Sequence, residues 1–233
     1  MIKVSNGELL VDYYETFGQW NNFLDSNFLC SKYMRNVFKF LYEVNKTGAL
    51  TTKIPKNVFK VFKLTDPKKL KAVIVVNTFE NKTGIPYGVP VNEYEKECIG
   101  LLNIKKEIEV NFYKGLDLNF DSTLESWLEQ GVLLLNINAA STEFDSYEKY
   151  LAKFYVTILQ TLSANITGLT YCFWGKDVVK YIPFVSKVSN YVLTCKDPEM
   201  LSPKDEIWGC GHFDQINRII YGQNELEEEL IKW

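Results

Sequence analysis

The stretch WLEQGVLLLN, residues 127–136, decides how this chain folds. Its apolar run is continuous rather than alternating, and it ends on the amide of Asn136. Three more runs share this character: AVIVV at 72–76, LTYCFW at 169–174 and YVLT at 191–194. Continuous apolar runs of this length are typical of strands buried on both faces of a parallel sheet. The sequence therefore predicts four buried strands in one mainly parallel sheet.

Helical patterns lie between these runs. Apolar side chains recur on one helical face over residues 145–164, where Asp145 followed by Glu148 resembles a capping box. A second helix is expected over residues 31–44. This alternation predicts an α/β fold with three αβα layers around a four-stranded sheet. Because ligands of such sheets bind beyond the carboxyl ends of the strands, the four following loops are the candidate site.

Composition limits the classes of function. The 233 residues, 46% of them hydrophobic, fit one domain spanning 1–233. The formal charge of −3 gives no basic surplus, so contact with DNA phosphates requires a local patch. The aromatic content of 15% predicts a well-filled core. The tail NELEEELIKW, residues 224–233, is expected to be a solvated helical end.

The cysteines and the single histidine restrict the chemistry further. Five widely spaced cysteines without a C-x-x-C pair predict free thiols, with no zinc site and no disulfide framework. Any histidine-dependent mechanism would have to use His212, for which a structural role is expected. We expect no metal and no cofactor. A start without a signal peptide and the lack of an 18-residue apolar run predict a soluble intracellular protein without membrane contact.

The four loops resemble those of the family 1 uracil-DNA glycosylases. SWLEQGVLLLN (126–136) resembles that family's W-x-x-Q-G-V-L-L-L-N, and CFWGKD (172–177) its L-L-W-G-S segment. VLTCKDPEMLSPKDEIWGCGHFDQIN (192–217) resembles V-L-x-A-P-H-P-S-P-L-S followed by G-C-x-H-F. KIPKNVFKVFKLTDPKKLKAVIVV (53–76) resembles the segment leading into G-Q-D-P-Y-H. Residues 1–50 match weakly and are interpreted as a divergent, helical N-terminal part.

The resemblance implies an enzyme that flips uracil out of DNA, inserts a leucine into the gap and cleaves the glycosidic bond. Such chemistry needs a carboxylate to position water and face the cationic sugar. It also needs a donor to stabilise the uracil anion. The family supplies these groups as the aspartate of G-Q-D-P-Y-H and the histidine of H-P-S-P-L-S.

This sequence departs from the family at both catalytic positions. Phe79 stands at the aspartate position, and Asp197 stands at the histidine position. A carboxylate about 4 Å from the developing anion would cost roughly 4 kcal/mol, which is nearly three powers of ten in rate. The tyrosine that excludes thymine is replaced by Asn81, and the stacking phenylalanine by Val91. No catalytic residue of the family's mechanism is therefore expected.

Other positions match the family. Asn136 matches the amide that reads the base, and Leu201 the wedge leucine. Lys176 replaces a serine that contacts phosphate, and Lys53, Lys56 and Lys82 are predicted to surround the same mouth. The candidate base-pocket residues are Asn136, Asn81, Val91 and Thr78, and the candidate DNA-binding residues are Leu201, Met200, Ser202, Lys176, Lys196 and Lys204.

The leading hypothesis is a catalytically inactive homologue that binds DNA, double- or single-stranded, or a protein partner such as a replication protein or a glycosylase inhibitor. The frequent use of Asn, Lys, Tyr and Phe suggests a viral or phage factor acting in replication or on the host. The alternative is an active DNA glycosylase of altered mechanism or base specificity, which recruits Glu80 or Asn77. A structural component that merely uses the fold is a third hypothesis.

Overall fold

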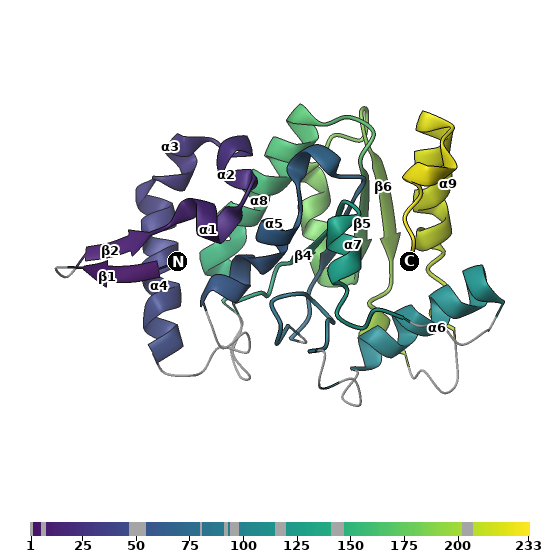
Figure 1. The fold of residues 1–233 in the computed structure, drawn as a ribbon, viewed down its shortest axis with the longest axis horizontal. Helices are drawn as coiled ribbons and strands as arrows, with labels where there is room; N and C mark the ends of the chain where they lie inside the picture. The colour runs from purple at the N-terminus through teal and green to yellow at the C-terminus, as the bar shows by residue number, and fades with distance from the viewer. Residues whose placement is uncertain are drawn as a thin grey trace.

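The central sheet of the computed structural model has four parallel strands in the order β4-β3-β5-β6, which confirms the predicted fold class (Figure 1). The strands are β3 (Ala72–Val76), β4 (Val132–Asn136), β5 (Thr170–Trp174) and β6 (Tyr191–Cys195). The structure describes residues 2–5, 8–46, 55–79, 81–90, 93, 98–114, 120–140, 147–201 and 207–233.

Strand burial follows the apolar pattern in three of the four strands. All residues of β3, β4 and β5 are buried, as continuous apolar runs require. The edge strand β6 differs, because the side chain of Tyr191 is 45% exposed and no residue of the strand is buried. The prediction of a buried fourth strand was therefore wrong. Its run has the composition of a buried strand, but unlike β4, the other edge strand of the sheet, it is left partly open to solvent.

The turn before β4 explains why its register is fixed. Gly131 has φ 94°, and a Cβ atom at this position would lie 2.1 Å from the carbonyl oxygen of Lys69. The Gly131 carbonyl accepts a hydrogen bond of 2.9 Å from the backbone N–H of Lys71, just before β3. A residue without a side chain thus brings the starts of β3 and β4 together. Consequently Val76 pairs with Asn136, and the carboxyl ends of the strands are level.

Helices cover both faces of the sheet. In Figure 1, α4 and α8 lie on one side with the N-terminal helices, and α9 lies on the other. The predicted helix 145–164 is observed as α8, with Tyr147 at its N-cap, and Asp145 lies outside the described residues. The helix expected over 31–44 is α4. The helices and 3₁₀ segments are α1 (Tyr13–Phe17), α2 (Trp20–Phe23), α3 (Ser26–Leu29), α4 (Lys32–Lys46), η1 (Pro55–Phe59), α5 (Lys60–Leu64), η2 (Pro67–Lys69), α6 (Ile99–Tyr113), α7 (Glu125–Glu129), α8 (Glu148–Asn165), η4 (Lys176–Phe184), η5 (Pro198–Met200), α9 (His212–Asn224) and η6 (Glu227–Glu229).

The N-terminal part also contains strands. Residues Ile2–Ser5 (β1) and Glu8–Val11 (β2) pair as an antiparallel two-stranded sheet, which the helical interpretation of residues 1–50 did not include. Within the described residues, no helix is long and apolar enough to cross a membrane.

The aromatic residues fill the core, as the composition predicted. Phe17, Phe59 and Phe154 form one buried cluster, with ring centroids 4.9 Å apart for Phe17–Phe59 and 5.2 Å for Phe59–Phe154. The rings of Trp127 and Trp233 form a second contact, with centroids 5.0 Å apart. Trp233 is only 8% exposed, so the expectation of a solvated tail was wrong. Glu227 and Glu228 of η6 are exposed, whereas Glu229 is half-buried and paired with Lys71. The apolar residues Ile231 and Trp233 that follow them return to the core.

Candidate functional site at the carboxyl edge of the sheet

The loops that follow β3, β5 and β6 meet through side-chain contacts at the carboxyl edge of the sheet. Asn77 Nδ2 donates to Asp177 Oδ2 at 3.2 Å, which joins the β3 loop to the start of η4. Thr78 Oγ1 donates to Glu199 Oε1 at 2.6 Å, which joins the same loop to η5. The sequence-predicted positions on these loops are therefore brought together.

Asn136 is buried at this edge and its amide oxygen is fully used. Its Oδ1 accepts from the backbone N–H groups of Thr78 at 3.2 Å and Asn138 at 3.0 Å, and its Nδ2 donates to the Thr78 carbonyl at 2.9 Å. The residue is 3% exposed. An amide oxygen has two acceptor sites, and both are occupied here. In this arrangement only one N–H of Asn136 remains to read a base.

Thr78 and Asn81 are also buried. Thr78 is 0% and Asn81 1% exposed. Asn81 Nδ2 donates weakly to the Ala139 carbonyl at 3.4 Å, and Asn81 Oδ1 is a buried acceptor without a hydrogen-bond partner. A buried, unpaired acceptor is uncommon and costly. Three predicted base-pocket residues thus gather behind the edge, whereas Val91 and Glu80 lie outside the described residues.

Phe79 lies at the surface of this edge, directly after the buried Thr78. Its side chain is 50% exposed. A phenyl ring can neither orient water nor offset a positive charge, so the exposed group following β3 has no acid–base chemistry.

Asp197 begins the loop after β6 and caps η5. Its Oδ1 accepts from the Glu199 backbone N–H at 2.8 Å. Its carboxylate also lies close to Gly175, where a Cβ atom would be 3.3 Å from Asp197 Oδ2. Burial raises the pKa of the Asp197 carboxyl, and the negative charge of Asp177 acts in the same direction. Asp197 is therefore easier to protonate than an exposed aspartate.

Asn103 of α6 holds the loop that contains the predicted wedge, and sequence reasoning missed it. Its Nδ2 donates to the carbonyls of Pro198 at 2.7 Å and Leu201 at 2.9 Å, although Asn103 itself is 0% exposed. Leu201 is partly buried against the core, whereas Met200 is 74% exposed. Of these two apolar side chains, Met200 is therefore the more exposed to solvent. The signal available in the sequence was an asparagine between apolar residues of α6, since a buried polar group needs hydrogen-bond partners.

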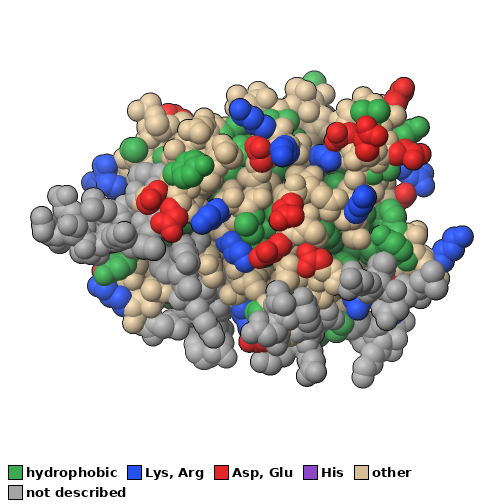
Figure 2. Space-filling view, in the orientation of Figure 1, with side chains coloured by type: hydrophobic (Ala, Val, Ile, Leu, Met, Phe, Trp, Pro, Cys, Tyr) green, Lys and Arg blue, Asp and Glu red, His purple; other side chains and the backbone are tan. Residues whose placement is uncertain are grey.

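The predicted basic patch is mixed in charge. Lys82, Lys176 and Lys196 are exposed, but Asp177 and Asp197 immediately follow two of them. Lys53, Ser202 and Lys204 lie outside the described residues, as does the side chain of Lys56. In the view of Figure 2, acidic and basic side chains are interspersed over the described surface rather than separated.

His212 has the structural role expected from the sequence. It is 2% exposed, and its Nδ1 accepts from Trp174 Nε1 at 3.0 Å. Burial lowers its pKa to about 4, against a smaller opposing effect of a hydrogen bond with the Thr194 backbone. The imidazole is therefore neutral near pH 7.

Glu107 of α6 is a second buried polar residue that the sequence reading missed. It is 0% exposed and accepts hydrogen bonds from the backbone N–H groups of Gly209 and of Gly211, the latter at 2.7 Å. It fixes the segment that leads into α9. Among the described residues, no group of three or more His, Cys, Asp and Glu side chains is arranged to hold a metal ion.

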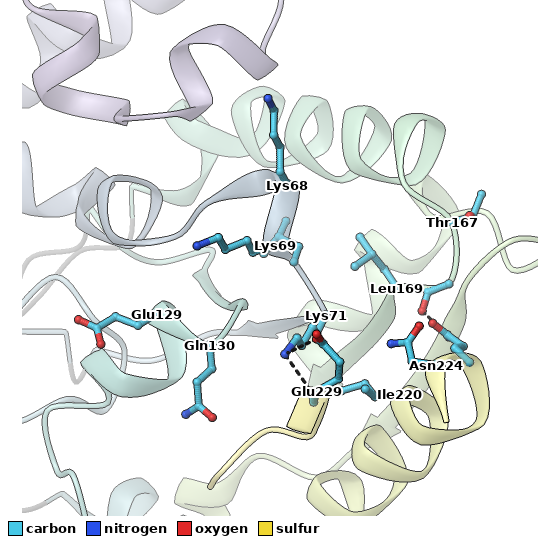
Figure 3. A pocket seen from close by; sticks show the side chains of 13 residues that line it. Lys68, Lys69, Lys71, Glu129, Gln130, Thr167, Leu169, Ile220, Asn224 and Glu229 are labelled. Carbon is cyan, nitrogen blue, oxygen red and sulfur yellow. Dashed lines mark hydrogen bonds and ion pairs between the residues drawn. The ribbon is translucent and has the colours of Figure 1, made fainter. Parts of the chain in front are cut away.

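A groove of about 520 Å³ opens at the opposite, amino edge of the sheet (Figure 3). Lys69, Lys71 and Gln130 contribute to its lining. Lys71 Nζ is paired with Glu229, 3.1 Å from Oε2 and 2.8 Å from the Glu229 carbonyl oxygen. The positive charge in the groove is thus partly compensated.

Uracil-DNA glycosylases are similar in sequence to most of this chain, although no family model matches it. The enzyme of Clostridioides difficile is 27% identical over 219 residues, covering 92% of this chain and 95% of the relative. That of Blochmanniella floridana is 25% identical over 216 residues, covering 86% and 91%. That of Aeromonas hydrophila is 29% identical over 181 residues, covering 72% and 77%.

Solved structures give the same answer for the fold. A variant of mimivirus UNG in complex with UGI superposes with a TM-score of 0.76 at 18% identity, covering 92% of this chain and 89% of that chain. Mimivirus uracil-DNA glycosylase gives a TM-score of 0.67 at 17% identity, covering 91% and 89%. The fold is therefore the three-layer α/β fold of the uracil-DNA glycosylases. With the sequence matches, the chain is a homologue of these enzymes.

Proposed function

We propose that this uracil-DNA glycosylase homologue acts by binding DNA or a protein partner, without the family's hydrolytic mechanism. The observation that carries the proposal is the exchange of chemical groups at one edge of the sheet. The resemblance puts the water-positioning carboxylate at Phe79, which is an exposed phenyl ring. It puts the donor to the leaving base at Asp197, which is a carboxyl group.

The state of Asn136 supports this proposal. Both acceptor sites of its oxygen are occupied by backbone N–H groups. Reading uracil requires an acceptor for the N3–H of the base as well as a donor to its O4. One N–H of Asn136 Nδ2 remains to donate to O4, but the N3–H of the base would have to displace one of the two internal hydrogen bonds to Oδ1. Such an exchange costs about 1–3 kcal/mol for each group left unpaired.

Binding through the same edge has two candidate partners. Exposed Lys176, Lys196 and Lys82 offer contacts to phosphate. The exposed side chain of Met200 offers an apolar contact beside them. A protein partner is the other candidate, because mimivirus UNG of the same fold has been solved in complex with UGI. The viral or phage origin suggested by the composition remains a prediction.

The test is single-turnover release of base from single-stranded uracil-containing DNA, with protein in large excess. The native chain is run beside the double variant Phe79→Asp/Asp197→His. We expect no release by the native chain. Gel shifts with duplex, single-stranded and uracil-containing DNA, and titration with UGI, then assign the partner. Base release by the native chain contradicts the proposal, and lack of salt-dependent binding to any DNA removes its DNA branch.

A second candidate is an active glycosylase of altered mechanism, which the raised pKa of Asp197 favours. A protonated Asp197 could donate to a leaving base, so this candidate requires release that increases as the pH falls. Asp197→Asn should abolish such release. Asn77 and Glu80 are the other groups that this mechanism could recruit. Asn77→Ala and Glu80→Gln test them separately, and full activity in either variant removes that residue from the mechanism.

A further inference from the structure

The phenyl ring of Phe79 is half exposed at the carboxyl edge of the sheet. Phenylalanine is among the residues most often buried in protein interiors. Within the described part of the chain, however, Phe79 is not a member of the hydrophobic core. Packing of the core therefore does not account for this side chain, and part of its surface is available to a ligand.

The backbone on both sides of Phe79 is held by hydrogen bonds. The side chain of Asn136 accepts from the Thr78 N–H at 3.2 Å and donates to the Thr78 carbonyl at 2.9 Å. The Phe79 carbonyl accepts from the Asn81 N–H at 3.0 Å. The ring thus projects from a fixed backbone. A side chain that is already positioned loses little conformational freedom when a ligand binds.

Met200 is a second exposed apolar side chain at this place. Thr78 Oγ1 donates to Glu199 Oε1 at 2.6 Å, and Phe79 and Met200 directly follow these two bonded residues. The flexible, polarisable side chain of methionine can adapt its shape to a neighbouring flat ring. Two exposed apolar side chains therefore start from one junction between the loops after β3 and β6.

Three exposed lysines belong to the same group of loops. Lys82 lies in the loop after β3, and Lys196 directly follows β6. Lys176 precedes Asp177, which accepts the 3.2 Å hydrogen bond from Asn77. None of the three lysines is in an ion pair with a described residue. Their positive charges are therefore available to phosphate groups.

Carboxylates at this edge limit its attraction for anions. Asp177 accepts from Asn77, Glu199 accepts from Thr78, and Asp197 accepts from the Glu199 N–H. These carboxylates form hydrogen bonds within the protein, but their charges still offset those of the neighbouring lysines. A nucleic acid bound here therefore depends on contacts to its bases as well as on contacts to its phosphates.

We propose that the carboxyl edge binds single-stranded DNA, with one base stacked on the Phe79 ring and with Lys82, Lys176 and Lys196 contacting the phosphates. This inference rests on the function proposed above and names the form of DNA that the edge takes. In a duplex, neighbouring base pairs cover both faces of a base, whereas a single strand can offer a face to an aromatic side chain. Because every base has such a face, the contact requires no particular sequence.

Fluorescence anisotropy with a labelled thymidine oligonucleotide of about twelve nucleotides measures the binding. We expect Phe79→Ala to weaken it about 5- to 150-fold, because the stacking contact is lost. Phe79→Trp should bind at least as tightly as the native protein. Tyr221→Ala is the matched control and should change nothing. Its side chain is 47% exposed, but its neighbours on α9, Ile220 and Gln223, line the groove at the opposite edge of the sheet.

A strand of the same length without bases separates stacking from a change in the protein's structure. The native protein and Phe79→Ala should bind this strand equally, since only its phosphates are contacted. A duplex of the same length should bind more weakly than the thymidine strand. Three phosphate contacts predict a slope of about −2 for the logarithm of the binding constant against the logarithm of salt concentration, and Lys176→Ala should reduce its magnitude by about 0.7.

The outcomes distinguish this inference from the function on which it rests. If the native protein binds none of these strands, both the inference and the DNA branch of the proposed function fail. If it binds the thymidine strand but Phe79→Ala binds as tightly, the role of Phe79 is overturned while DNA binding stands. An equal loss for the strand without bases has the same meaning. Tighter binding of the duplex overturns the assignment to single strands.

Discussion

The side chain of Asn136 forms two hydrogen bonds with the backbone of Thr78: Nδ2 donates to the carbonyl at 2.9 Å, and Oδ1 accepts from the N–H at 3.2 Å. This pair joins the end of β4 to the loop after β3. The amide at the end of an apolar strand therefore has a structural role in this arrangement, whatever it does with a ligand.

Replacing Asn136 with alanine should destabilise the protein by about 2 kcal/mol or more, because buried backbone groups of Thr78 and Asn138 lose their partner. Urea unfolding followed by tryptophan fluorescence measures the change. Asn77→Ala is the matched control, since its hydrogen bond to Asp177 is exposed and should contribute less than about 0.5 kcal/mol. An Asn136→Ala variant with native stability but impaired ligand binding would show that the amide serves recognition alone.

Gly131→Ala should be among the more damaging small substitutions. The residue has φ 94°, and the new Cβ atom would lie 2.1 Å from the carbonyl oxygen of Lys69. Either β4 moves relative to β3 or the chain is strained, and we expect a loss of about 2 kcal/mol or more. Gly222→Ala is the control, because nothing lies within 4 Å of its added Cβ atom on α9. That change should stabilise the protein by up to about 1 kcal/mol, and equal effects of the two substitutions would contradict this account.

Trp233→Ala should show that the final segment is part of the core. The indole packs against Trp127, with ring centroids 5.0 Å apart, and Phe213 at 4.9 Å. Its Nε1 donates to the Phe213 carbonyl at 3.1 Å. Removing such a side chain costs about 3–5 kcal/mol. Thermal unfolding provides the measurement, with Leu226→Ala as an exposed control. A melting temperature unchanged by Trp233→Ala would return this segment to the solvated tail expected from its sequence.

The sheet was predictable from the sequence because its strands are continuous apolar runs, which are typical of a parallel sheet covered on both faces. The exposure of β6 was not predictable, since the covered edge strand β4 and the partly exposed edge strand β6 are both continuous apolar runs. Trp233 was missed for a related reason: a run of glutamates masked the apolar residues that follow it. Hydrophobic pattern predicts which segments are buried, but not what they pack against.

The site was predictable only in part. Positions after each strand could be assigned because parallel strands end at one edge. The hydrogen-bond partners of those residues could not be predicted, because they come from elements distant in sequence. Asn103 is such a partner of Leu201, and Glu199 of Thr78.

His212 should give the protein a distinctive dependence of stability on pH. Burial lowers its pKa in the folded state to about 4, against an ordinary value of 6.5. Between pH 6.5 and pH 4, the unfolded chain therefore binds a proton at His212 that the folded chain does not bind. The stabilisation is complete above pH 6.5 and is lost as the pH falls towards 4. At about 1.4 kcal/mol for each pKa unit, the full loss is about 3 kcal/mol.

The measurement is the free energy of unfolding in urea from pH 7.5 to pH 4, for the native protein and for His212→Gln. Glutamine can still accept a hydrogen bond from Trp174 Nε1, but it does not titrate. The carboxyl groups titrate equally in both proteins, so the difference between the two curves isolates His212. We expect the native curve to fall more steeply below pH 6.5. Parallel curves would mean that His212 takes up its proton as readily in the folded chain as in the unfolded one, and would remove the buried, neutral imidazole from this account.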